Sequence, residues 1–202
     1  ARYSHTLGPL DFGISYFQGT ARDPVLIQGV DTFSSEPILI PRYELIRRGG
    51  LEAQLILGGW ALKAEGTYEE KERAPAEINY SALAGLVFTL VGILETFYDL
   101  GLNVENLYDE RLEAAPQPFD DDIFAGLRLV FNDEAGSEIL AGAIVDRHRG
   151  TALYQVEGSR RFGDDWNLAL EVQLVEDTVP EDAAVFALRN DDLVRLTLSY
   201  YL

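Results

Sequence analysis

The side chains best able to do chemistry in this chain are its two histidines and the acids near one of them. His148 closes the triplet Asp146-Arg147-His148, and the acidic triplet Asp120-Asp121-Asp122 precedes it. A histidine beside carboxylates can act as a general base toward water. Ser4 and His5 are neighbours, so on a strand they point to opposite faces and form no pair. The chain has no Cys, which excludes a thiolate nucleophile or thiolate metal site.

The charge of the chain argues against a nucleic-acid partner. There are 34 acidic residues against 16 basic ones, giving a formal net charge of -18 that would repel a polyanion. The acids cluster in 69–72, 109–110, 120–122, 176–177 and 181–182, between apolar-periodic segments, so we interpret them as solvated loops. Such loops can bind divalent cations, but no fixed ligand spacing is present. We predict no cofactor and no resident metal.

The elements that must position any site are strands. Apolar and polar residues alternate with a period of two in segments such as 10–17, 60–68, 98–105 and 194–202. The pattern predicts about eleven strands. They are 1–6, 10–20, 38–57, 60–70, 78–91, 96–109, 122–132, 138–148, 152–162, 166–176 and 191–202. Because no helical crossover separates them, we predict an all-β, closed, antiparallel up-and-down transmembrane barrel, a single domain over 1–202.

The connections between the expected strands alternate in length. The short ones are 8–9, 58–59, 92–95, 133–137 and 163–165. The long ones are 20–37, 71–77, 110–121 and 177–190, while 149–151 is brief where a long one is expected. Outer-membrane barrels have short periplasmic turns and longer extracellular loops. The alternation therefore favours a transmembrane barrel over a soluble, lipocalin-like one.

Aromatic residues gather toward both ends of the expected strands. Trp60 and Trp166 directly follow short turns, and Phe131, Phe162 and Tyr200 lie toward the same end. The tyrosines toward the long-loop end are Tyr43, Tyr68, Tyr80, Tyr108 and Tyr154. Two aromatic belts around an aliphatic band are typical of a membrane-spanning barrel. We predict that the membrane-interface aromatics include Trp60, Trp166, Tyr68, Tyr80, Phe131 and Tyr200.

The polar side of the strands carries charged and amide side chains near mid-strand. Buried in a soluble barrel, unpaired charges would be costly, whereas a wet lumen solvates them. The residues predicted to line such a lumen are Glu52, Lys63, Glu65, Asn103, Glu105, Arg128, Glu157, Arg161, Glu171 and Arg195. Charges on successive strands alternate in sign, in the order Glu105, Arg128, Asp146, Arg161 together with Glu157, Glu171 and Arg195. A ladder of cross-strand ion pairs is therefore feasible.

The ending LVRLTLSYYL, residues 193–202, alternates in the same way and finishes on a hydrophobic residue. It resembles the C-terminal strand of porin-like outer-membrane barrels of Gram-negative bacteria, and the architecture of nearly the whole chain resembles that class. The class usually ends in Phe, and this chain ends in Leu202. The resemblance implies a place in the bacterial outer membrane, contact with its lipid and lipopolysaccharide, and recognition of the last strand by the barrel-assembly machinery. It leaves the oligomeric state open.

The direction of the first strand gives one more expectation. Single-chain bacterial barrels have an even number of strands and periplasmic termini. With Leu202 periplasmic, the strand 1–6 would begin on the extracellular side. We therefore expect at least one upstream strand to be missing, a barrel of about 12 strands, and a chain that is the C-terminal part of a longer one.

The Asp-x-Asp pair in the triplet 120–122 and the Asp-x-His pair in the triplet 146–148 are similar to the Asp–Asp and Asp–His pairs with which omptin proteases activate water above a barrel rim. The resemblance implies that Asp146 orients His148 while Asp120 and Asp122 hold the water. In this chain the pairs come from adjacent strands instead of opposite walls of a cleft, and arginines flank His148. We therefore predict no catalytic residue and no enzyme, and keep the protease as a remote alternative.

These observations favour a channel for passive diffusion of small polar solutes, with cations preferred because of the acidic loops. The main alternative is a non-conducting barrel that acts as a membrane anchor or a partner-binding scaffold. A lumen plugged by mutually satisfied ion pairs would serve that role.

Overall fold

The computed structural model describes residues 1–72, 77–112 and 119–201. Its strands are β1 (Arg2–Leu7), β2 (Leu10–Thr20), β3 (Val25–Val30), β4 (Pro37–Arg42), β5 (Leu45–Leu57), β6 (Trp60–Lys71), β7 (Glu77–Leu90), β8 (Asp99–Asp109), β9 (Asp121–Val130), β10 (Glu138–Asp146), β11 (Ala152–Phe162), β12 (Trp166–Glu176) and β13 (Leu193–Tyr200). The short helices are η1 (Ile93–Glu95) and α1 (Ala183–Phe186). Leu202 and the centres of the expected loops 71–77 and 110–121 lie outside the described residues.

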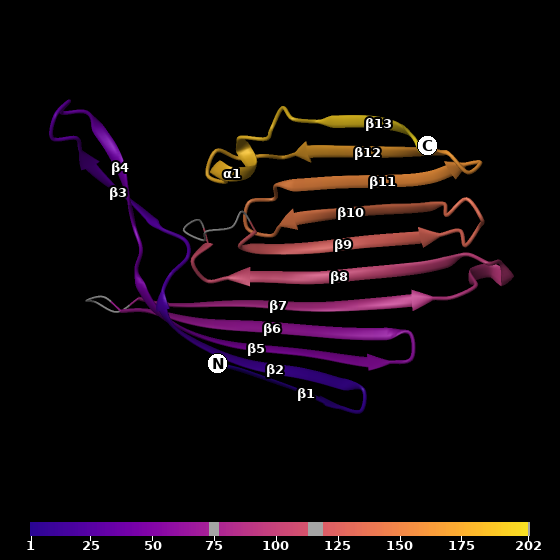
Figure 1. Cartoon of the computed structure of the whole chain (residues 1–202), viewed down its shortest axis with the longest axis horizontal. Coiled ribbons are helices and arrows are strands. Elements are labelled where there is room, and N and C mark those ends of the chain that lie inside the picture. Colours follow the sequence, from indigo (N-terminus) through magenta and orange to yellow (C-terminus); the bar gives the residue numbers. More distant parts are fainter. Residues whose placement is uncertain (73–76, 113–118, 202) are drawn as a thin grey trace.

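Eleven of the strands form one antiparallel sheet in the order β1-β2-β5-β6-β7-β8-β9-β10-β11-β12-β13. Figure 1 shows them side by side, from β1 at the bottom to β13 at the top. Every strand of this sheet pairs with the next one along the chain, apart from the inserted β3 and β4. The predicted all-β antiparallel meander is therefore confirmed, because period-two segments joined by local connections pair with their sequence neighbours.

The region 20–57 is where the predicted elements were wrong. The expected loop 20–37 contains β3, and the expected strand 38–57 is two elements, β4 and β5. β3 and β4 pair only with each other, as a separate two-stranded hairpin. Its strands VLIQGV and PILIPR lack clean alternation, so their residue pattern does not mark where the sheet strand begins.

The β3–β4 hairpin stands away from the sheet at the left of Figure 1. At its tip the Asp31 carboxylate accepts hydrogen bonds from the backbone N–H groups of Phe33 (2.7 Å) and Ser34 (2.8 Å). These N–H groups, that of Ser34 foremost, lower the pKa of Asp31. The tip is thus locally ordered while the Phe33 side chain is 99% exposed.

The two ends of the sheet differ in their connections. The right-hand end in Figure 1 carries the short turns, and the left-hand end carries the hairpin, α1 and the other long connections. Gly8 and Gly58 make the two-residue turns with left-handed φ angles of 60° and 59°, which glycine adopts without steric cost. Among the described residues, no helix has the length and hydropathy to cross a lipid bilayer.

The edges of the sheet are β1 and β13. Each successive pair is antiparallel, so eleven strands leave the first and the last running in the same direction. An antiparallel bond pattern cannot join two strands that run the same way. The described sheet is therefore a large up-and-down sheet with two edges.

Candidate functional site

The register of the sheet sorts its side chains onto two faces. Residues directly opposite each other in neighbouring strands share a face, and successive residues of a strand alternate. Lys63 lies opposite Gly85, and Gly85 lies opposite Glu105. Glu105 lies opposite Phe124, and Arg128 is on the same strand as Phe124 at an even spacing. We call the face that carries these residues the polar face.

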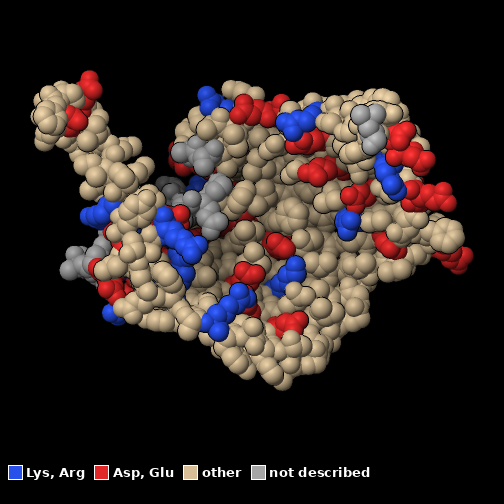
Figure 2. All heavy atoms as spheres, in the orientation of Figure 1, with Lys and Arg blue, Asp and Glu red and all other residues tan. Residues whose placement is uncertain are grey.

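All ten residues predicted to line a lumen lie on the polar face. In the second half of the sheet, the residues that lie opposite each other in successive strands are Arg128, Leu140, Glu157, Glu171 and Arg195. Glu52 lies opposite Glu65 in the first half. The complete set is Glu52, Lys63, Glu65, Asn103, Glu105, Arg128, Glu157, Arg161, Glu171 and Arg195. Figure 2 shows charged side chains gathered in the hollowed middle of this side of the molecule.

The opposite face is apolar, and we call it the apolar face. On the sheet strands its charged side chains lie only near strand ends, at Arg47, Glu70, Asp121, Arg160 and Glu176. Its middle is aliphatic and exposed, with Leu51, Leu102, Leu127, Leu170 and Leu198 as examples. Such a contiguous exposed apolar surface marks contact with a partner or with lipid.

The predicted interface aromatics lie on the apolar face, toward its two ends, in pairs of neighbouring rings. Toward the short turns, Trp60 stacks on Phe88 at 4.0 Å between ring centroids, and Trp166 lies 4.8 Å from Tyr200. Phe131, in the turn after β9, lies 5.1 Å from Tyr98. Toward the long connections, Tyr68 lies 5.4 Å from Tyr80. These two aromatic rows thus bracket the aliphatic middle of the face.

The predicted ladder of ion pairs is largely wrong. Arg195 does pair with Glu171, at 3.0 Å, as the strand order suggested. Arg128 pairs instead with Glu138 at 2.7 Å, and Asp146 pairs with Arg149 at 2.6 Å in the turn beyond its strand. The register brings like charges together elsewhere, with Glu52 opposite Glu65 and Glu157 opposite Glu171.

The consequence is that some charges of the polar face are compensated and others are not. Arg2 pairs with Glu52, and Arg161 donates to the backbone carbonyl of Glu134 at 2.9 Å. Within the described part of the chain, the sheet residues of this face without an ion pair include Lys63, Glu65, Glu105, Glu157 and Arg161. Three of these five are carboxylates, so the uncompensated charge of this set is negative.

Several glycines let side chains lie along the sheet. A Cβ added at Gly13 would meet the Glu52 carboxylate, and one added at Gly85 would lie 3.0 Å from Glu105 Cγ. The Phe124 ring reaches within 2.7 Å of a Cβ built at Gly126 and 2.9 Å of one built at Gly142. These side chains therefore lie flat against the polar face, and the hollow above that face stays open.

Replacing Gly126 by alanine should lower the free energy of unfolding by about 1–3 kcal/mol, because the new methyl group must displace the Phe124 ring. Denaturant unfolding in detergent micelles measures the loss. Gly49→Ala is the matched control, since a Cβ at that strand position meets nothing within 4 Å. The double variant Gly126→Ala, Phe124→Leu should recover part of the loss. Equal stability of the two alanine variants would contradict this packing.

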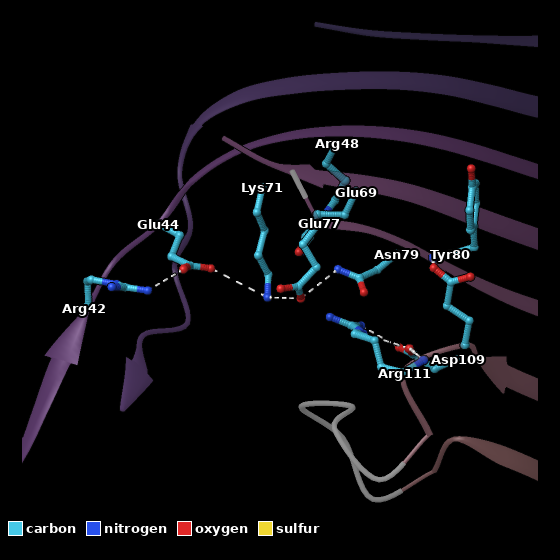
Figure 3. Close-up of polar contacts among 11 residues, drawn as sticks. Arg42, Glu44, Arg48, Glu69, Lys71, Glu77, Asn79, Tyr80, Asp109 and Arg111 are labelled. Atoms are coloured by element: carbon cyan, nitrogen blue, oxygen red, sulfur yellow. Dashed lines mark hydrogen bonds and ion pairs between the residues drawn. The ribbon is translucent and has the colours of Figure 1, made fainter. Parts of the chain in front are cut away.

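A network of ion pairs ties the base of the β3–β4 hairpin to the sheet. Arg42 donates to Glu44 at 2.9 Å, Lys71 lies 3.6 Å from Glu44, and Lys71 donates to Glu77 at 2.7 Å (Figure 3). Glu77 begins β7, and Asn79 Nδ2 lies 3.5 Å from Glu77 Oε1, which continues the network along that strand. The hairpin therefore leaves the sheet from an anchored base.

A second polar cluster lies beside it, where β8 ends. Arg111 donates from Nε to Asp109 at 2.8 Å (Figure 3). The Glu110 carboxylate accepts the backbone N–H of Tyr80 at 2.8 Å. Arg48 donates from Nε to Glu69 at 2.8 Å. These contacts hold neighbouring strands together at the long-connection end of the sheet.

The candidate protease residues do not form an Asp–His pair. Asp146 accepts the backbone N–H groups of His148 (2.6 Å) and Arg149 (2.7 Å), and its other oxygen accepts the Arg149 guanidinium at 2.6 Å. The same guanidinium donates to Asp120 at 3.1 and 2.8 Å. These hydrogen bonds, that of Asp120 foremost, raise the pKa of Arg149. The carboxylates that would orient a catalytic histidine are therefore engaged by an arginine.

Asp122 is the remaining acid of this cluster. It lies opposite Asp146, is buried, and its Oδ2 has no hydrogen-bond partner in the described ranges. No group of three His, Cys, Asp or Glu side chains there is placed to hold a metal ion.

Three contributors to this site escaped the sequence interpretation. Glu138 neutralises Arg128, Phe124 lies over two glycines of the polar face, and Arg149 holds two buried carboxylates. The spacing of Phe124 from Arg128 could have put it on the same face. Glu138 and Arg149 gave no such signal, because their partners depend on register and turn shape.

Comparison with protein-family models, with curated proteins and with solved structures finds no match to this chain.

Proposed function

We propose that the chain forms most of an outer-membrane β-barrel whose water-filled lumen passes small polar solutes by diffusion, with a preference for cations. The observation that carries the proposal is the division of the sheet into one hollowed face that is charged in its middle and one apolar face with two aromatic rows. Lipid favours the apolar face with its aromatic belts, and water favours the charged face. In a soluble barrel with the apolar face inside, the charged face would lie outside in water, and the two aromatic rows would meet no membrane interface.

Closure of the barrel is part of this proposal. One further strand, antiparallel to both β1 and β13, would pair with both edges and give an even count of about 12. Closure would also satisfy the unpaired backbone groups of two edge strands, which a bilayer cannot solvate. The last strand would be the segment that the barrel-assembly machinery recognises, with lipid and lipopolysaccharide around the apolar face.

Single-channel recording in planar bilayers tests the proposal. The natural full-length protein should give discrete conductance steps in potassium chloride, and it should need detergent or lipid to stay folded and dispersed. A fully folded, monodisperse protein in plain buffer would remove the membrane assignment. A folded membrane protein without conductance steps would remove the channel.

One feature favours a non-conducting scaffold as the second candidate. The β3–β4 hairpin exposes large apolar side chains on both its faces, including Leu26, Val30, Leu39 and Ile40. A two-stranded hairpin is marginally stable alone, and exposed apolar patches mark interaction sites. Absence of conductance together with a partner lost on deletion of residues 25–42 would favour the scaffold.

A further inference from the structure

The polar face holds a depression of about 480 Å³ between β8 and β11, large enough for a small organic molecule. Its lining includes Asn103, Phe124, Arg128, Gln155 and Glu157. Asn103, Gly126, Gly142 and Gln155 are successive cross-strand partners, so they form one row across four strands. The two glycines leave room in the middle of that row, and the Phe124 ring occupies part of it.

Each of the two amides already donates one N–H to a carboxylate of its own strand. Asn103 Nδ2 donates to Glu105 at 3.1 Å, and Gln155 Nε2 donates to Glu157 at 2.6 Å. Asn103 Oδ1 is buried, and no described residue donates to it. An acceptor left without a donor is costly unless a ligand or water supplies one. Gln155 is exposed, and its amide oxygen is left as an acceptor for a ligand that carries N–H groups.

The charges around the depression point the same way. Arg128 is neutralised by Glu138, and Glu171 is neutralised by Arg195. Glu157 lies between these pairs in the cross-strand series Arg128, Leu140, Glu157 and Glu171, and no described residue forms an ion pair with it. Asp99 also lines the depression without an ion pair to a described residue, but its carboxylate accepts hydrogen bonds from Asn132 Nδ2 and from the backbone N–H of Gly92. The surplus charge of the lining is thus negative, and the Phe124 ring lines the same depression, which suits a cation with an apolar part.

We propose that this depression binds small primary organic ammonium ions. The ammonium group would donate to Glu157 and to the amide oxygen of Gln155, two residues away on the same strand, and the hydrocarbon part would lie against Phe124. The inference rests on the proposed function only in that this face must be open to water. It adds a preference for one chemical class of ligand, which a channel that sorts solutes only by size and charge would not show.

Equilibrium binding of benzylammonium and benzyl alcohol to the full chain in detergent micelles tests this site. The two probes share size and ring and differ in charge and N–H donors. Chemical-shift titration at pH 7, corrected with protein-free micelles, should give a dissociation constant for benzylammonium on the order of tenfold lower than for the alcohol. Equal affinity for the two probes in the unaltered protein would overturn the proposal, whatever any variant does.

Glu157→Gln should abolish the preference for the ammonium probe, because it removes the uncompensated charge at an exposed, sterically matched position. Glu65→Gln is the control, since it removes the same charge from the same face outside the depression. Phe124→Leu should weaken both probes together. Retained preference in Glu157→Gln, or equal loss in Glu65→Gln, would overturn the site.

The outcomes for the site and for the channel are separable. Binding in micelles without conductance in bilayers would remove the channel and support the depression as a ligand site. Conductance without any preference between the two probes would support the channel and remove the site.

Discussion

Replacing Arg149 by methionine should lower the free energy of unfolding by about 3–5 kcal/mol. The Arg149 side chain is 6% exposed, and it bridges Asp120 and Asp146, whose side chains are 4% exposed. Methionine keeps an unbranched apolar stem but lacks the guanidinium group, so both carboxylates stay buried without a counter-charge. Asp122, opposite Asp146, adds a third acid to the uncompensated group.

Denaturant unfolding in detergent micelles, followed by the fluorescence of Trp60 and Trp166, measures this loss. The neighbouring Arg147→Met is the matched control, because Arg147 is 45% exposed and its pair with Asp121 lies at the surface. Exposed pairs contribute about 0–1 kcal/mol, so the control should lose little.

The triple variant Arg149→Met, Asp120→Asn, Asp146→Asn should regain much of the lost stability. It would do so because the penalty arises from the charges left unpaired, which the two amides remove. Similar losses for Arg149→Met and Arg147→Met would show that burial does not determine how much the Arg149 ion pairs contribute to the free energy of unfolding.

Neutralising Glu65, Glu105 and Glu157 together should reduce the cation preference of the proposed channel on the order of threefold or more. These carboxylates make no ion pair with described residues, so their field is not cancelled locally. Reversal potentials across a potassium chloride gradient in planar bilayers measure the ratio of cation to anion permeability. Lys63→Gln, which removes an uncompensated positive charge from the same face, should move the ratio the other way.

The control for this prediction is the pair Glu171→Gln, Arg195→Gln. These residues neutralise each other at 3.0 Å, so removing both leaves the net charge unchanged. The double variant should therefore keep the reversal potential of the unaltered protein. A shift as large as that of the triple glutamine variant would mean that paired and unpaired charges act alike.

The strands of the sheet and the faces of their side chains could be predicted from the sequence. The alternation around Trp60–Tyr68 and Val194–Leu202 predicted strands, and their phase predicted which residues share a face. Both follow from local chemistry, because a strand exposes successive side chains on opposite sides whatever it pairs with. The ten charged and amide residues expected on one side are all there for that reason.

The hairpin of β3 and β4 shows where local pattern was insufficient. Residues 38–42 have the apolar character of a sheet strand, but they pair with residues 25–30 and leave the sheet. Whether an apolar segment joins the sheet depends on which strands are available to pair with it. The residues of that segment alone do not determine this.

Charge pairing was decided by the tertiary structure for a related reason. The choice of Glu138 by Arg128, and the burial of Arg149 between Asp120 and Asp146, depend on strand register and on the shape of a turn. The sequence by itself determined that this chain forms a wide antiparallel sheet with one charged and one apolar face, because side-chain direction in a strand has a period of two. Only the tertiary structure decided which charges cancel and which remain, because an ion pair needs two side chains within about 4 Å and strand order alone does not set that distance.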